Sequence, residues 1–242
     1  MIRSYGVRLA GRGFWGFGCP DNLVGVTSQK GHHHTRELTV FVQIIQGQVD
    51  DPSAIQAALD RWVSDLAGEA TGWLGSTAGV TDDGTFLTVA RFESEEAARR
   101  NSDRPEQGQW WSETSRLFRG EASFTESTEV DLDLMGDPDQ AGFVQVFRQR
   151  VTDPDRAREL MKTDVEDFRD FRPDLLGTLT AVHDGGLTTT VAYFTSEEEA
   201  RAGEQKQPPA EMMAAMQEMQ ELSVGEPEYF DLRSPWMASP RG

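Results

Sequence analysis

The strongest constraint on this chain is an internal repeat, in which short motifs recur 102 positions later without a gap. The matching pairs are Phe41-Val42-Gln43-Ile44 with Phe143-Val144-Gln145-Val146, Asp51-Pro52 with Asp153-Pro154, Leu74-Gly75-Ser76 with Leu176-Gly177-Thr178, Ala90-Arg91-Phe92 with Ala192-Tyr193-Phe194, and Ser94-Glu95-Glu96 with Ser196-Glu197-Glu198. Five co-linear matches at one offset are hard to produce by chance, and a period of about 100 residues is too long for a solenoid repeat. The chain therefore contains two copies of one domain.

Both copies predict the same order of elements. Strands are indicated by β-branched and aromatic residues, helix starts by Asp-Pro and by Ser followed by acidic residues, and tight turns by Asp-Gly and Gly-Gly. In the first copy we expect a strand over 39–49, a helix after Asp51-Pro52, strands over 73–80 and 85–92, helices after Ser94 and over 108–118, and a last strand near 122–132. In the second copy we expect the equivalent strands over 175–182 and 187–194, a helix over 209–222 and a last strand near 226–232.

This β-α-β-β-α-β order is that of the ferredoxin-like split βαβ unit. One such sheet carries helices on one face only, so its other face must be buried against another layer. Two linked copies supply that layer. We therefore expect an α+β chain of two tandem ferredoxin-like units, packed sheet to sheet as an intramolecular dimeric α/β barrel, and either a monomeric pseudo-dimer or a homodimer.

The repeat also predicts the domain boundaries. They are an N-terminal arm over 1–37, copy one over 38–135, a linker over 136–141, copy two over 142–234 and a C-terminal tail over 235–242. The arm is rich in glycine, shows no sustained period, and contains the histidines at 32–34. Such a segment is either a disordered arm or translated sequence upstream of the true start.

Composition excludes several classes of function. A formal net charge of −18 opposes binding to nucleic acid or to an anionic membrane surface. No apolar run approaches the length of about 18 residues that a membrane span requires. A single cysteine, Cys19, fits a reducing compartment, so we expect a cytoplasmic protein. Phosphate loops, metal-ligand spacings and nucleophile elbows are not recognisable, so we expect no cofactor.

The repeated motifs resemble the dimeric α/β-barrel superfamily, in particular its antibiotic-biosynthesis-monooxygenase-like (ABM) group. The likeness covers about 38–232 and rests on the opening Phe41-Val42-Gln43 and Phe143-Val144-Gln145 strands, the Gly75 and Gly177 strands, and the Phe92-x-Ser94-Glu95-Glu96-Ala97 and Phe194-x-Ser196-Glu197-Glu198-Glu199-Ala200 junctions. The superfamily includes cofactor-free oxygenases acting on aromatic polyketides, haem-degrading enzymes, muconolactone-type isomerases and members with no assigned reaction. The resemblance therefore implies the fold but no single activity.

Three residues are candidates for catalysis. His183 is the histidine outside the arm, and histidine transfers protons near neutral pH; because it enters a hairpin turn, a surface role is the alternative. Arg91 and Tyr193 occupy equivalent strand positions. Both could donate a hydrogen bond to an enolate or phenolate oxygen, as an oxygenase needs; the alternative is a strand end that reaches solvent.

Five residues are candidates for ligand binding. Gln43 and Gln145 are equivalent amides among apolar strand residues, and each is either a polar anchor in a pocket or a structural hydrogen-bonding group. Trp73, Trp110 and Trp111 have no aromatic counterparts in copy two. Packing of a core is the usual role of such side chains, but their asymmetry makes copy one the better candidate for an aromatic ligand.

Two hypotheses follow. The first is an ABM-like protein that binds a small apolar or aromatic molecule in a barrel pocket, with cofactor-free monooxygenation as its reaction. The second is a non-catalytic ligand-binding or protein-interaction module, favoured by the few catalytic residue types in the repeated core. The mismatches between the copies indicate that any ligand pocket either occurs in one copy only or differs between the two copies.

Overall fold

The computed structural model describes residues 40–161 and 165–240. The predicted arm over 1–37 lies outside the described residues. Copy one consists of β1 (Phe41–Gln48), α1 (Pro52–Asp65), β2 (Trp73–Val80), β3 (Thr85–Phe92), α2 (Glu95–Ser102), α3 (Pro105–Thr114), β4 (Ser123–Ser127) and β5 (Glu129–Leu134). Copy two consists of β6 (Phe143–Val151), α4 (Pro154–Met161), α5 (Val165–Phe171), β7 (Leu175–His183), β8 (Leu187–Phe194), α6 (Glu197–Glu204), α7 (Ala210–Leu222), β9 (Ser223–Leu232) and β10 (Trp236–Ala238).

Local signals place the helix starts where the sequence predicts them. The Asp51 carboxylate accepts hydrogen bonds from the backbone N–H groups of Ser53 and Ala54 at 3.0 and 3.1 Å, which caps α1. The equivalent serines cap the next helix of each copy. Ser94 Oγ accepts from the backbone N–H of Ala97 at 3.1 Å, and Ser196 Oγ from that of Glu199 at 3.2 Å. Repeated sequence thus produces repeated local structure.

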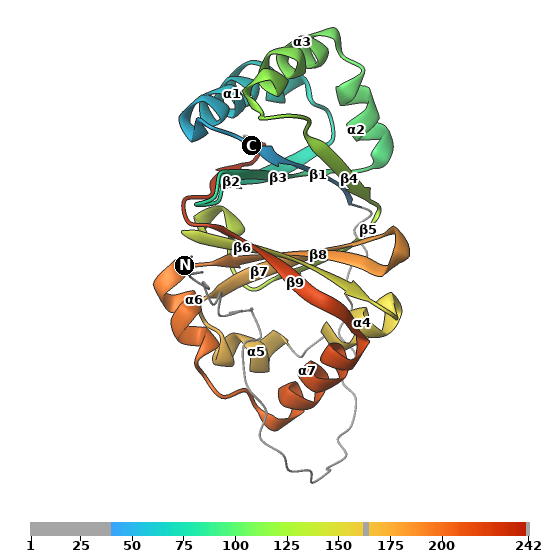
Figure 1. Ribbon diagram of the computed structural model, residues 1–242, viewed down its shortest axis with the longest axis vertical. Coiled ribbons are helices and arrows are strands. Elements are labelled where there is room, and N and C mark those ends of the chain that lie inside the picture. Colours follow the sequence, from blue (N-terminus) through green and yellow to red (C-terminus); the bar gives the residue numbers. More distant parts are fainter. Residues whose placement is uncertain (1–39, 162–164, 241–242) are drawn as a thin grey trace, which may run out of the picture.

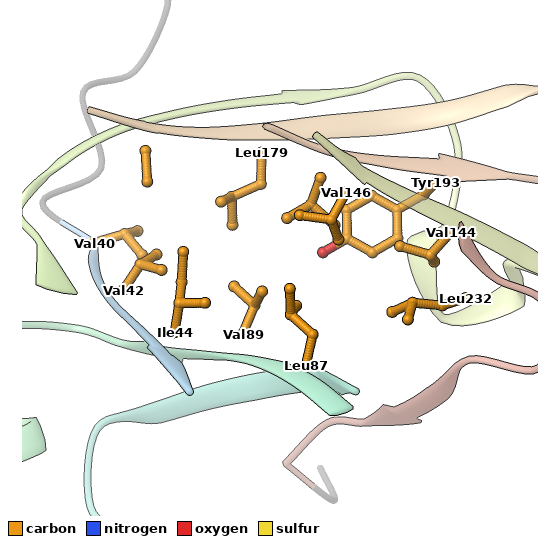
Figure 2. Packing of buried hydrophobic residues seen from close by; sticks show 12 residues of the cluster. Val40, Val42, Ile44, Leu87, Val89, Val144, Val146, Leu179, Tyr193 and Leu232 are labelled. Atoms are coloured by element: carbon orange, nitrogen blue, oxygen red, sulfur yellow. The ribbon is translucent and has the colours of Figure 1, made fainter. Parts of the chain in front are cut away.

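The molecule has four layers, with helices outside and two sheets facing each other between them (Figure 1). The strand orders are β10-β2-β3-β1-β4 and β5-β7-β8-β6-β9, and every neighbouring pair is antiparallel. Side chains from both sheets point at one another and form one apolar core, which Figure 2 shows. This confirms two ferredoxin-like units packed sheet to sheet.

The edge strands differ from the sequence prediction, because each sheet receives one strand from the other copy. The single strand expected near 122–132 is interrupted at Thr128: β4 pairs with β1 of its own copy, whereas β5 pairs with β7 of copy two. Residues 235–242, expected as a tail, contain β10, which pairs with β2 of copy one. Alternating strand residues fit either sheet equally well, so the pattern alone does not identify the partner.

Two equivalent glycines make room for these exchanged strands. A Cβ atom added at Gly75 would lie 2.8 Å from the Ala238 carbonyl oxygen of β10, and one added at Gly177 would lie 2.8 Å from the Asp133 carbonyl oxygen of β5. Gly75 also has a φ of +127°, which side-chain-bearing residues rarely adopt. The repeated Leu-Gly motif therefore marks where each copy accepts the strand of the other.

Candidate functional site

A hollow of about 170 Å³ opens between β1, α2 and β4 of copy one, on the helix side of the sheet. Phe41 and Ala98 form its apolar part, and both are buried. Its polar part comes from Gln43 on β1, Glu126 on β4, and the α2 segment that carries Glu95, Arg99, Ser102 and Asp103. We call this site the copy-one hollow.

The side chains around the copy-one hollow leave it open. Gln43 Nε2 donates a hydrogen bond to Glu126 Oε1 at 2.8 Å, which orients both groups from neighbouring strands. The Arg99 guanidinium pairs with Glu95 one helical turn earlier, with 68% of the Arg99 side chain exposed. Among the described residues, no cation of the protein is recorded over the aromatic ring of Phe41, whereas Arg201 lies over Phe143 in copy two.

The equivalent place in copy two is filled. Gln145 Nε2 donates to Asp231 Oδ1 at 2.7 Å, in the same register as Gln43 and Glu126. Arg201, which is equivalent to Arg99, turns inward instead. Its Cζ lies 5.2 Å from the ring centroid of Phe143, and its guanidinium pairs with Asp231. A planar cation of the protein thus occupies the second copy of the site.

One substitution between the copies explains the difference. Glu204 of α6 is buried and accepts a hydrogen bond from Arg201 at 2.8 Å, so it holds the guanidinium in place. The equivalent residue in α2 is Ser102, which carries no charge and is exposed. Arg99 therefore lacks the second carboxylate that retains Arg201, and it pairs with the neighbouring Glu95.

Comparison with solved structures places this architecture among known folds. A candidate monooxygenase from Lactobacillus acidophilus superposes with a TM-score of 0.66 at 12% identity, over 83% of this chain and 96% of that one. A candidate monooxygenase from Fusobacterium nucleatum gives a TM-score of 0.61 at 11% identity, over 84% and 96%. A protein described as anthrone oxidase-like gives 0.58 at 12% identity, over 82% and 93%. The chain folds as two tandem ferredoxin-like units that form an intramolecular dimeric α/β barrel.

At these identities the match shows the fold of the pseudo-dimer and nothing finer. Each superposition covers more than four fifths of this chain, so both copies take part in it. No protein-family model matches the sequence, and comparison with curated protein sequences gives no match. Activity must therefore be argued from the residues.

Of the predicted catalytic residues, Arg91 and Tyr193 lie apart from the hollow, on strand faces directed between the two sheets. Tyr193 is 1% exposed and its hydroxyl lies 3.0 Å from Thr77 Oγ1 of copy one. Burial raises the pKa of Tyr193 above its usual value. Arg91 Nε is also buried and has no hydrogen-bond partner among the described residues. Their catalytic roles stay predictions.

His183 is half-buried rather than exposed, because the end of β7 packs against β4 of copy one. Its Nδ1 lies 3.1 Å from the Glu126 carbonyl oxygen, and its Nε2 lies 3.1 Å from Thr189 Oγ1. Since a carbonyl only accepts, Nδ1 carries the proton and donates. Burial, together with the nearby positive charge of Arg148, lowers the pKa of His183. The imidazole ring thus links the two copies through these two contacts.

The tryptophans pack the helix–sheet core of copy one and do not line the hollow. Trp73 is buried edge-on against Trp62, with 5.0 Å between ring centroids, and its Nε1 donates to Ser76 Oγ at 3.0 Å. Trp110 Nε1 donates to the Ala58 carbonyl oxygen at 2.9 Å. Trp111 contacts the ring of Phe124 edge-on at 5.2 Å. In this structure the three rings fill space between elements.

Of the predicted ligand-binding residues, only Gln43 lines the copy-one hollow. The sequence prediction missed Arg99, Ser102 and Glu126. A signal for them exists in the mismatch between Ser102 and Glu204, which lie 102 positions apart.

Within the described part of the chain, no three His, Cys, Asp or Glu side chains are grouped so that they could hold a metal ion. No described helix is long and apolar enough to cross a membrane.

Proposed function

We propose that the protein binds a small planar aromatic molecule in the copy-one hollow. The observation that carries this proposal is the contrast between the copies: the same arrangement of residues receives the planar Arg201 side chain in copy two and is open in copy one. The proposed site lies on the helix side of the copy-one sheet, whereas the pocket expected from the sequence would lie in the barrel, where apolar side chains of both sheets meet (Figure 2).

The size of the hollow limits the ligand. Pockets that enclose drug-sized molecules measure about 300 to 1,000 Å³, whereas this hollow measures about 170 Å³. One or two fused rings fit such a volume, with part of the molecule facing solvent. The ring of Phe41 favours an aromatic ligand, because aromatic faces and edges attract one another.

The binding proposal is tested by closing the hollow. Backbone and side-chain amide NMR signals of the whole chain are followed while 2-naphthol or benzamide is added. We expect shifts at Gln43 and Ala98 but not at Gln145 and Ala200. Ser102→Glu supplies the carboxylate that copy two uses, so Arg99 turns inward and the shifts disappear.

A matched control is Ser112→Glu, which makes the same substitution at an exposed position of α3. This variant keeps the full response to the aromatic probes. The proposal fails when no probe at millimolar concentration perturbs the signals around Gln43, or when both glutamate variants respond alike.

A second candidate function is cofactor-free monooxygenation, which the shared fold and the Glu126 carboxylate favour. A carboxylate at the hollow is a suitable base for an activated methylene between two aromatic rings. Such a CH2 group reacts with one O2 to give a ketone and one water molecule. The carbon loses two protons and four electrons, and O2 accepts the electrons. One oxygen atom enters the carbonyl and the other leaves as water.

This reaction is tested with anthrone as the probe substrate. Oxygen uptake is recorded with an electrode while anthraquinone is measured by chromatography, both corrected for the reaction without protein. Oxygenation predicts equal amounts of O2 consumed and ketone formed, and loss of both in Glu126→Gln. Binding without any turnover would instead support the non-catalytic ligand-binding module.

A further inference from the structure

We infer that the ligand of the copy-one hollow is a planar organic cation, an amidinium or guanidinium group joined to a small ring. This inference rests on the proposed function, because it names the chemical class that the same site accepts. Its starting point is Arg201, whose side chain shows which group the repeated site holds.

In copy two the site holds a guanidinium between one aromatic ring and two carboxylates. The ring of Phe143 lies 5.2 Å from Arg201 Cζ, at a distance where a cation is attracted to an aromatic face. Asp231 supplies a carboxylate from β9. Glu204 supplies another from α6, the helix that carries Arg201, with Glu204 Oε1 2.8 Å from Arg201 Nη1. Planar guanidinium and amidinium groups fit paired carboxylates because their N–H groups point in one plane.

Copy one keeps the aromatic ring and the strand carboxylate that receive the cation, whereas its own arginine, Arg99, pairs with Glu95. Phe41 replaces Phe143, and Gln43 and Glu126 keep the register of Gln145 and Asp231. The carboxylates of Glu95 and Asp103 stand at the rim, so three acidic side chains and one arginine line the hollow. An added cation would therefore meet an excess of negative charge.

A second difference between the copies adds to the excess of negative charge around the copy-one hollow. In copy two Glu197 is paired with Arg233 at 2.8 Å as well as with Arg201 at 3.5 Å. The residue that follows β4 in the place of Arg233 is Thr128, which is neutral. Glu95, which is equivalent to Glu197, has only Arg99 as a partner within ion-pair distance among the described residues.

The hydrogen-bonding side chains at the copy-one hollow also favour a ligand that donates hydrogen bonds. Carboxylates and amide carbonyls accept hydrogen bonds, and amidinium groups only donate them. In copy two Gln145 is 1% exposed and its Oε1 has no hydrogen-bond partner among the described residues. The amide of Gln43 is held in the same way by Glu126, so its carbonyl is available at the hollow for an incoming N–H group.

Three probes of one shape and different charge test the inference. Benzamidine carries a planar cation, benzamide is its neutral analogue and benzoate is its anionic analogue. Affinities for the full chain are measured by NMR titration at low and high salt. We expect benzamidine to bind at least about tenfold more tightly than benzamide, with benzoate weaker still, and this preference to shrink at high salt because charges are screened.

Two variants separate the inference from the binding proposal. Glu126→Gln removes a charge and keeps the shape, so it should weaken benzamidine about tenfold and leave benzamide nearly unchanged. Ser102→Glu should abolish binding of both, and Ser112→Glu of neither. When benzamide binds as tightly as benzamidine and Ser102→Glu blocks both, the cation inference is wrong and the binding site stands. When no probe perturbs the hollow, both proposals are wrong.

Discussion

Arg148 donates a hydrogen bond to Gln46, the residue that occupies its own position in the other copy, 102 positions earlier. The two equivalent side chains meet between the sheets, so this contact joins the copies where a symmetric dimer would place identical residues together. Arg148 also lies over the ring of Phe230, with Cζ 5.3 Å from its centroid. Burial lowers the pKa of Arg148. The two copies therefore differ at this contact, where copy one has a neutral glutamine and copy two a charged arginine.

Replacing this charge should change the titration of His183. Arg148 is one of the groups that lower the pKa of His183, because two positive charges repel. Arg148→Met keeps an unbranched side chain and removes the charge, so the pKa of His183 should rise toward its usual value of 6.5. Proton NMR titration of the imidazole Cε1–H signal measures the change. The exposed Arg61→Met variant is the control and should leave the pKa unaltered; an unchanged value in Arg148→Met would contradict the prediction.

Stability should fall on mild acidification because of His183. Its pKa is lowered in the folded state, mainly by burial, so the unfolded chain takes up the proton first as the pH falls. The stability contribution is complete above pH 6.5 and is lost as the pH falls toward the lowered pKa of the folded state. Urea unfolding at about pH 7.5 and about pH 5.5 measures the loss, in a range where most carboxylates are still charged. In His183→Gln the difference between the two pH values should be smaller than in the unaltered chain.

Tyr193→Phe distinguishes a structural role from a catalytic one. The phenol contacts Thr77 Oγ1 at 3.0 Å inside the core between the sheets, so its removal should cost about 1 to 2 kcal/mol of unfolding free energy. Thr77→Val and the double variant complete a cycle that isolates the pair. Binding of aromatic probes to the hollow should stay unchanged. A loss of binding or turnover at full stability would establish the catalytic role predicted from the sequence.

Gly177→Ala should destabilise the chain by displacing β5. The added Cβ would lie 2.8 Å from the Asp133 carbonyl oxygen, which belongs to backbone and cannot rotate away. Overpacking of this kind costs about 1 to 3 kcal/mol. Gly68→Ala is the control, because its Cβ would meet no atom within 4 Å. Urea unfolding measures both variants, and hydrogen exchange should show faster opening of β5 in Gly177→Ala alone.

The order of elements was predictable because its signals are local. The Asp51 and Ser94 caps, the Gly84 turn and the apolar strands each depend on a few neighbouring residues. The exchange of β5 and β10 was not predictable in this way. Which sheet an edge strand joins depends on residues far away in the chain, and Trp236–Ala238 is too short to show a period.

The candidate site was predictable only in part. Gln43 could be singled out because a polar residue recurs at the same place in two apolar strands. The open hollow depends instead on the partner of the arginine on the second helix of each copy: Arg99 pairs with Glu95, whereas Arg201 pairs with Glu204, for which copy one has Ser102. Comparing the copies by their matching motifs finds residues that are the same in both. The function proposed for copy one depends instead on a residue that differs, Ser102 in place of Glu204. His183 was expected near the surface because its contact with β4 of copy one is invisible along the chain.

The exchanged strands make the two halves mutually dependent. A break between Asp137 and Gln140 would leave each fragment holding a strand that completes the other fragment's sheet. Each fragment alone would expose an unpaired sheet edge, which invites pairing with other chains. The fragments are therefore expected to recombine as a domain-swapped heterodimer whose assembly depends on concentration. In the intact polypeptide the same exchange takes place within one molecule, so dilution does not undo it.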